Sequence, residues 1–325
     1  MMKKSALAVV VAASMLPAAA MAETTLYGQA RVFFVNDDNG TNDAWALESE
    51  ASRLGVKGSA ELDGNLEAIY KLEYEVDPAD SGAASGNGAV EQVFKRRNQY
   101  VGLKGNFGQV ILGRHDTPLK KAQGKIDLFN DYYEADIKRA LTPVVENGEN
   151  RVNSVIYYKS PAIADAVNIH VALVPGETPG GDDGIADSTS IAVTYNTDSL
   201  FLSLASDDFA NDDKLVRLAG QFKGDGFGAG LIYQTAENAA GTEETGFVLS
   251  GYYKATDNTK LKLQHVSSEV DATGGTETTQ TTLGVDYKLG KKTTLAGYYT
   301  TREQEAAGTT LAERDVFGAG LIHKF

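Results

Sequence analysis

Four carboxylates are concentrated in "KIDLFNDYYEADIKR" (125–139), a stretch of the chain without regular alternation. They are Asp127, Asp131, Glu134 and Asp136, and the apolar residues beside them are Ile126, Leu128 and Phe129. The stretch lies within residues 116–150, and connections of this length are usually functional. If the apolar residues hold it against the wall of a barrel, the carboxylates face a lumen, where they would act on ions and polar solutes. The alternative interpretation is an ordinary surface loop.

The other chemically capable residues form no catalytic or metal-binding pattern. The four histidines show no metal-ligand spacing, and the chain has no cysteine to assist them. His265 and Ser267 share a strand face, but no third group completes a nucleophilic site. "GDGFGA" (224–229) has the form of a dinucleotide fingerprint, yet an alternating strand follows it instead of a helix. We therefore expect no enzyme activity, no cofactor and no metal site.

The elements that must position these charges are β-strands. In "NLEAIYKLEYEVD" (65–77), apolar residues occupy every second position and mainly charged residues lie between them. This period indicates a strand with two different faces. It recurs sixteen times, near 24–36, 51–62, 65–76, 93–104, 107–115, 151–160, 167–174, 188–196, 200–206, 214–223, 226–235, 245–254, 258–267, 279–289, 292–302 and 313–325.

Composition and the N-terminal segment favour an exported membrane protein. "MMKK", an apolar run and "AMA" at 20–22 predict a secretory signal peptide over residues 1–22, followed by one domain over 23–325. Beyond residue 22 no run of eighteen apolar residues occurs, so a spanning chain must form a closed barrel. The formal net charge of −14, or −16 without Lys3 and Lys4, argues against a nucleic-acid partner.

The spacing and the charges of the predicted strands indicate a transmembrane barrel with a water-filled interior. Short turns such as 63–65, 105–106 and 224–226 alternate with longer polar connections such as 36–49, 77–92 and 175–187, as in outer-membrane barrels. A basic side chain facing lipid at the bilayer midplane costs roughly 2–4 kcal/mol. The basic residues expected on the inner face are Arg53, Lys57, Lys71, Arg97, Lys262 and Lys288. Sixteen strands leave room for an aqueous channel between such side chains.

Several motifs together resemble the general-diffusion porins of Gram-negative outer membranes. They are "LYGQARV" (26–32), "SRLGVKG" (52–58), "NLEAIYKLEYE" (65–75), "YVGLKGNFGQVILGRHDTP" (100–118), "RVNSVIYYKSP" (151–161) and "GAGLIHKF" (318–325). Singly these motifs are weak, but their order and spacing extend over essentially the whole chain after residue 22. The resemblance implies homotrimers of antiparallel sixteen-stranded barrels, with the third loop, here 116–150, folded into the lumen as a constriction.

The resemblance also implies a ladder of arginines opposite acidic residues of that loop. By motif, the ladder corresponds to Arg53, Arg97 and Arg151 in this sequence. A lysine common after "LYG" in the family is replaced by Gln29, which reduces the positive charge of this wall. The acidic partners are expected among Asp127, Asp131, Glu134 and Asp136, with the first two favoured.

The expected function is passive diffusion of ions and small hydrophilic solutes through the outer membrane, with lipid and lipopolysaccharide around the barrel. Charged rings in such a pore set its ion preference. Two alternatives remain open at this point. One is a substrate-specific channel of the same architecture, which would need a ladder of aromatic residues or a dense basic path. The other is a barrel that serves mainly as an adhesin or receptor, whose loop-borne binding would not depend on conductance.

Overall fold

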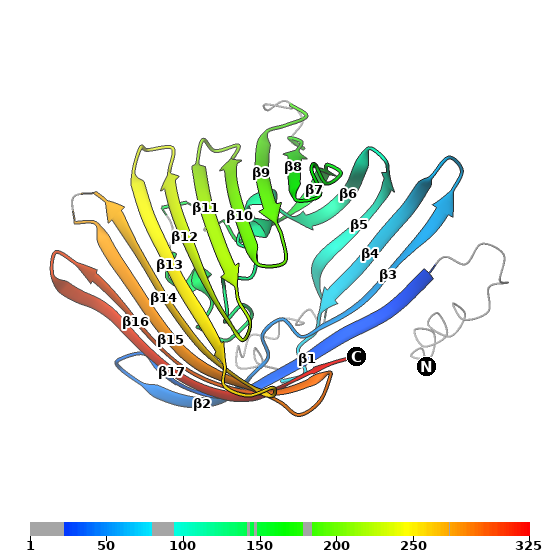
Figure 1. Ribbon diagram of the computed structural model, residues 1–325. Coiled ribbons are helices and arrows are strands. Elements are labelled where there is room, and N and C mark those ends of the chain that lie inside the picture. Colours follow the sequence, from blue (N-terminus) through cyan, green and yellow to red (C-terminus); the bar gives the residue numbers. More distant parts are fainter. Residues whose placement is uncertain (1–22, 80–93, 142–143, 146–147, 178–183, 273) are drawn as a thin grey trace, which may run out of the picture.

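The protein is described by a computed structural model over residues 23–79, 94–141, 144–145, 148–177, 184–272 and 274–325. The predicted signal peptide and most of the predicted connection 77–92 lie outside these residues. One antiparallel sheet contains seventeen strands (Figure 1). They are β1 Glu23–Asp38, β2 Asp43–Glu48, β3 Arg53–Leu62, β4 Leu66–Glu75, β5 Lys95–Gly105, β6 Gly108–Asp116, β7 Arg151–Lys159, β8 Val167–Val174, β9 Ser188–Asn196, β10 Leu200–Asp208, β11 Lys214–Lys223, β12 Phe227–Glu237, β13 Glu243–Lys254, β14 Thr259–Asp271, β15 Thr276–Lys288, β16 Thr293–Ala306 and β17 Thr309–Lys324.

The sheet closes on itself through β1. One edge of β1 pairs with β17, with Phe33 opposite Gly320. Its other edge pairs with β3 near its beginning and with β2 near its end. Because β2 and β3 occupy the same edge in succession, they form one interrupted strand of the wall. The predicted sixteen-stranded antiparallel barrel is therefore confirmed.

The interruption between β2 and β3 was not predicted, since residues 36–49 were expected to be a connection throughout. Within this stretch Trp45 and Leu47 are exposed, so the outward alternation continues there, although the flanking residues are polar. The chain leaves the ladder between Glu48 and Arg53, where Ala51 has a φ of 55°. The Ser52 hydroxyl replaces the missing ladder bonds, because it accepts from the Arg31 amide and donates to the Arg31 carbonyl.

The two faces of the wall differ in polarity as the alternation predicts. On β13, Leu249 is 60% exposed while its neighbour Val248 is fully buried on the opposite face. Aromatic pairs lie at two levels of the exposed face: Phe222 with Phe227 beside a short turn, and Tyr233 with Phe247 further along the strands. An apolar band between two aromatic levels is the usual lipid-facing surface of a membrane barrel.

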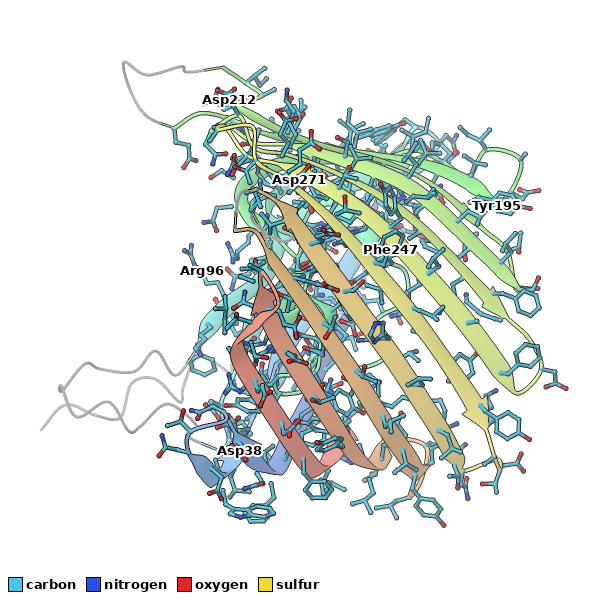
Figure 2. All side chains as sticks on the ribbon, turned by 90° about the vertical axis from the view of Figure 1, so that its left-hand side faces the viewer. Asp38, Arg96, Tyr195, Asp212, Phe247 and Asp271 are labelled. Atoms are coloured by element: carbon cyan, nitrogen blue, oxygen red, sulfur yellow. The ribbon has the colours of Figure 1, made fainter. Side chains whose placement is uncertain are left out.

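The connections at the two ends of the barrel are less unequal than predicted. Figure 2 shows Asp38, Asp212 and Asp271 at one end of the strands and Tyr195 at the other. At the first end, β14 and β15 are joined by 272–275, and β16 and β17 by only 307–308. The last four strands run three or four residues beyond the predicted limits at this end, because polar pairs such as Thr278 with Gln304 continue the ladder.

Helical structure is minor in the described residues. It consists of α2 at Pro118–Lys121 and a single 3-10 turn at Ile137–Arg139, both between β6 and β7. Neither is long and apolar enough to cross a membrane.

Candidate functional site

The long connection after β6 covers residues 117–150, and its described residues 117–141, 144–145 and 148–150 pack against the polar face of the wall. Figure 1 shows it within the curve of the strands. Three apolar contacts hold it: Leu119 against β9–β12, Ile126 and Ile137 against β11–β14, and Phe129 with Tyr132 against β1 and β16. The strand residues in these contacts alternate with the exposed apolar side chains, so they lie on the face that a closed barrel turns inward.

Polar side chains of the same strands satisfy the backbone of this connection. Ser203 donates to the Ala122 carbonyl at 2.6 Å, Ser268 to the Ala140 carbonyl at 2.8 Å, and Tyr298 to the Tyr133 carbonyl at 2.8 Å. A buried irregular segment must find such partners, since each unpaired buried peptide group costs about 1–3 kcal/mol. The inner hydroxyls and amides therefore fix the path of the chain here.

The connection begins with a short, well-capped helix. The Thr117 side chain accepts from the Lys120 amide at 3.1 Å, and Pro118 occupies the first helical position, where its missing N–H is not needed. The predicted start at 116 differs by one residue, because Asp116 still pairs with Arg151 in the sheet.

Asp131 is the point where this connection meets the basic wall. Its carboxylate pairs with Arg53 at 2.5 Å and with Arg31 at 3.6 Å. The guanidinium of Arg31 also lies over the ring of Tyr132, 4.8 Å from its centroid. Asp131 has a φ of 62°, a left-handed conformation that Asp tolerates better than most residues. Such backbone strain persists where the surroundings hold it.

Arg97 and Arg151 are paired with acidic residues of the strands, not with the connection. Arg97 donates to Glu75 at 2.6 Å and to Glu73 at 3.2 Å. Arg151 pairs with Asp116 at 2.9 Å and donates to the Asn98 side chain at 3.1 Å. Of the three arginines singled out in the sequence, only Arg53 is thus in direct contact with an acidic residue of the 117–150 segment.

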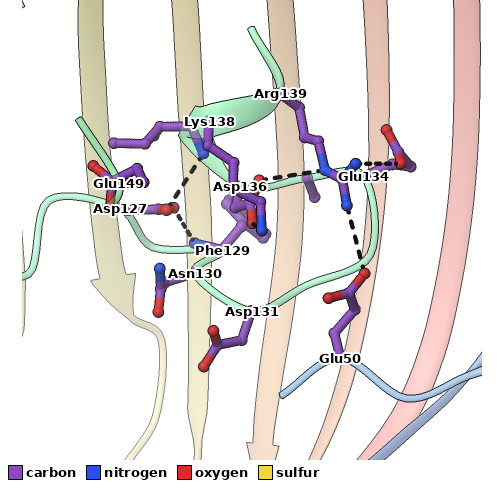
Figure 3. A network of polar contacts seen from close by, with 12 residues as sticks. Glu50, Asp127, Phe129, Asn130, Asp131, Glu134, Asp136, Lys138, Arg139 and Glu149 are labelled. Carbon is purple, nitrogen blue, oxygen red and sulfur yellow. Dashed lines mark hydrogen bonds and ion pairs between the residues drawn. The ribbon is translucent and has the colours of Figure 1, made fainter. Parts of the chain in front are cut away.

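Glu134 joins the connection to a second group of arginines. It pairs with Arg302 of β16 at 2.8 Å, with Arg139 at 2.9 Å and with Arg314 of β17 at 3.4 Å. Figure 3 shows Arg139 between Glu134 and Glu50, the latter at 3.5 Å. Like Asp131, Glu134 has a positive φ, of 54°. The carboxylate is buried, so the three guanidinium groups replace its water.

The other two acidic candidates, Asp127 and Asp136, make contacts within the connection itself. Asp127 accepts from the Phe129 amide at 3.1 Å (Figure 3). It also accepts from the Ile137 amide at 3.3 Å and from the Gln264 side chain at 3.2 Å. Burial, with the nearby Glu149 carboxylate, raises the pKa of Asp127 to about 6. These contacts make Asp127 a bridge across its own loop, which differs from the lumen-facing role expected for it.

Asp136 is buried beside two cations of its own segment. It pairs with Lys138 at 2.9 Å and approaches Arg139 at 3.6 Å. Burial raises the pKa of Asp136 to about 7, because the loss of hydration outweighs the attraction of these two partners.

Four basic residues that sequence reasoning left out of the ladder belong to the site: Arg31, Arg139, Arg302 and Arg314. The inward orientation of Arg31 can be predicted from the sequence, because Arg31 lies two residues after Gln29 and therefore on the same face of the strand. It supplies positive charge beside the position where the family's lysine is missing. Arg302 and Arg314 lie opposite each other on β16 and β17, at the ends predicted for those strands.

Comparison with known proteins agrees with this architecture. Outer membrane porin protein 32 of Delftia acidovorans is 37% identical over 134 residues, covering 40% of this chain and 36% of that protein. Major outer membrane protein P.IB of Neisseria sicca is 36% identical over 137 residues, covering 39% and 35%. The chain thus spans about a third of the length of these curated relatives.

Solved structures extend the likeness to the whole barrel. The anion-selective porin from Comamonas acidovorans matches with a TM-score of 0.76 at 23% identity, over 94% of this chain and 100% of that one. OmpT of Vibrio cholerae matches with a TM-score of 0.71 at 17% identity, over 96% and 100%. The family described as Gram-negative porin matches residues 6–307. Since this match covers most of the sequence, the chain belongs to the Gram-negative porin family.

Proposed function

We propose that the protein is a water-filled diffusion pore of the outer membrane, which passes ions and small hydrophilic solutes without catalysis. The observation that supports this proposal is the set of ion pairs that join Asp131 and Glu134 to arginines on the inner face of a closed sixteen-stranded wall. An apolar outer band suits lipid, and a charged inner face suits water.

The 117–150 segment forms the constriction in this proposal. Asp131 pairs there with Arg31 and Arg53 of the wall, and the buried Glu134 pairs with Arg302. Each of these contact pairs is a dipole at the edge of the pore, and its local field orients water and dipolar solutes. Apolar solutes must disrupt that ordered water, so they pass less readily. Arg97 and Arg151 form further pairs of this kind with carboxylates of the strands, without contacting an acidic residue of the segment.

We call the end of the barrel that holds Tyr195 and the turn 255–258 the short-turn end, and a weak preference for anions follows from its inner surface. There the wall carries lysines such as Lys223, Lys254 and Lys288, while the constriction itself is nearly balanced in charge. The net negative charge of the whole chain opposes this preference only weakly, because charges in distant loops are screened within about 8–10 Å at physiological salt. The structurally similar Comamonas protein is itself named an anion-selective porin.

A homotrimer in contact with outer-membrane lipid and lipopolysaccharide is part of the proposal. Its support is membership of the porin family and the fold shared with OmpT of Vibrio cholerae, for which a trimer form is described. The outer face of β1–β5 and β17 carries exposed apolar side chains such as Leu26, Leu72 and Phe317, which suit either lipid or a second copy.

The test is single-channel conductance of the purified protein in a planar bilayer under a KCl gradient. We expect conductance steps in multiples of three and a reversal potential displaced modestly towards that of chloride. Folded, inserted protein that carries no current would overturn the pore and favour the adhesin or receptor. A saturable current for one solute class only would favour the substrate-specific channel instead.

A further inference from the structure

A cavity of about 660 Å³ lies beneath the 117–150 segment, at the short-turn end of the lumen. Its wall residues come from the inward-facing positions of β1, β11 and β13–β17, and Lys125, Leu128 and Tyr132 of the segment close its other side. Eight of its lining residues are Lys or Arg and two are Asp. We call this cavity the basic vestibule. Such an excess of positive charge contrasts with the acidic chain as a whole.

Most of the vestibule lysines have no acidic partner. Lys223, Lys254 and Lys288 make no ion pair within the part of the chain that the structure describes. The exceptions are Lys260 and Lys262, which share Asp286 at 3.3 and 2.8 Å. One of the two aspartates is therefore already engaged by two lysines. The positive charge of the remaining lysines is available to a solute.

Arg31 adds an observation of a different kind. It lines the vestibule, yet only 6% of its surface is exposed, and its Nη1 atom is occupied by Asp131 and the Asn130 carbonyl. Its Nε and Nη2 atoms have no hydrogen-bond partner among the described residues. Buried donors of a charged group are costly to leave unpaired. These atoms are out of reach of a solute in the cavity, but Arg31 shares the single carboxylate of Asp131 with Arg53 and so adds positive charge beside the vestibule.

We propose that the basic vestibule is a binding site for small anions that carry two or more carboxylate or phosphate groups. Several lysines around one cavity favour a ligand with several charges over chloride, because each additional charge is attracted by the whole group. The residues that would hold it are Lys223, Lys254, Lys260 and Lys288, with Thr259 and Asn258 as neutral partners, while Arg31 adds positive charge beside them. The inference rests on the proposed function in one respect: an anion reaches the site through the pore.

Calorimetric titration of folded protein in detergent with citrate, and separately with inorganic phosphate, tests the site without requiring an open channel. The informative variant is the double substitution Lys254→Gln and Lys288→Gln, whose side chains make no ion pair in the described structure. The matched control is Lys291→Gln with Lys292→Gln, which removes the same charge from the adjoining exposed turn, outside the cavity lining. In water a lysine about 6 Å from one carboxylate strengthens binding about threefold.

We expect citrate to bind the unmodified protein, about tenfold more weakly to the vestibule variant, and within about twofold of the original for the turn variant. Absence of citrate and phosphate binding to the unmodified protein, or equal loss in both variants, would overturn the proposal. The same variants in a planar bilayer separate the two hypotheses. If the protein conducts KCl but calorimetry shows no anion binding, the proposed pore stands and the proposed anion site is overturned. If the protein binds anions but never conducts, the anion site stands and the proposed pore is overturned.

Discussion

At the scale of single residues, the constriction depends on which carboxylate meets which guanidinium. Asp131 is shared by Arg31 and Arg53, whereas Arg97 and Arg151 have their own acidic partners on neighbouring strands. Alternation along each strand indicates that these arginines face inward, but it carries no information on their height in the pore. The expected ladder therefore divides into one arginine bound to the segment and two bound to the wall.

Replacing Asp131 with Asn should increase the anion preference of the pore. The substitution removes one negative charge beside Arg31 and Arg53, and Asn tolerates the left-handed backbone at this position. We expect the chloride-to-potassium permeability ratio to rise about two- to fourfold, measured by reversal potential in a KCl gradient. Asp212→Asn is the control, because Asp212 is exposed in a loop and also has a positive φ, of 66°. An unchanged ratio in Asp131→Asn would show that this pair lies away from the ion path.

The buried carboxyl of Asp136 should make the protein less stable as the pH rises. Its folded-state pKa of about 7 lies above the unfolded value of 3.8. Its contribution to stability is therefore greatest below the unfolded pKa and is lost as the pH rises through about 7. Asp136→Asn resembles the protonated form, so it should leave stability unchanged near pH 4 and raise it by about 2–4 kcal/mol at pH 8.

Guanidinium unfolding in detergent, followed by fluorescence of the single Trp45, measures this difference at each pH. Trp45 stacks on Phe34 of the exposed face, with 4.7 Å between ring centroids, so its emission should report loss of the barrel. Equal stability of the variant and the parent protein at both pH values would contradict the prediction. Asp212→Asn again serves as the control, because it makes the same chemical change at an exposed loop position.

At the scale of elements, the 117–150 segment is held by apolar anchors that the sequence identified in part. Ile126 and Phe129 were expected to contact the wall, and both are fully buried there. Small residues of the wall leave the space that these side chains fill, and the sequence did not indicate this. A Cβ added at Gly284 of β15 would lie 2.5 Å from the Phe129 ring and 3.1 Å from the Gly297 carbonyl oxygen.

Gly284→Ala should displace Phe129 and loosen the segment. Overpacking of this kind lowers the free energy of unfolding by about 1–3 kcal/mol. We expect the segment to move, because the paired strands are held more rigidly than it is. We expect a lower unfolding midpoint and greater fluctuation of the single-channel current. Gly251→Ala on β13 is the matched control, since its added Cβ would meet only the Gly228 carbonyl oxygen, at an ordinary 3.6 Å. Identical behaviour of the two variants would show that the Phe129 contact does not control the segment.

At the scale of the whole molecule, the exposed face determines how the barrel sits in the bilayer. Leu249 lies between Tyr253 and Phe247 on the same face of β13, within the apolar band. Leu249→Arg should lower the free energy of unfolding from lipid by about 2–4 kcal/mol. Thr235→Arg, on the same face of β12 beyond Tyr233, should cost only about 0–1 kcal/mol. Urea or guanidinium unfolding in lipid vesicles measures both, and equal costs would contradict the assigned depth.

Much of this barrel could be predicted from the sequence, because the two faces of a strand follow directly from a period of two. Lipid favours apolar side chains on one face and water favours polar side chains on the other. The outward face of a strand such as those of Leu249 and Leu283 can therefore be identified from its own sequence. The short strand Asp43–Glu48 was missed, since six residues between polar flanks carry too little of the pattern. The function followed from the resemblance of several motifs, and the inward charges agreed with it.

Only the tertiary structure decided how the charges are grouped. Arg31 and Asp131 are separated by a hundred positions, and the stagger of strands around a closed barrel sets the height at which they meet. Asp127 was a candidate equal to Asp131 in sequence, but the fold of the segment turned its carboxylate onto backbone amides. The vestibule lysines come from strands spread over most of the C-terminal half. They form one site because closure brings their inner faces around the same water, and no local pattern carries that information.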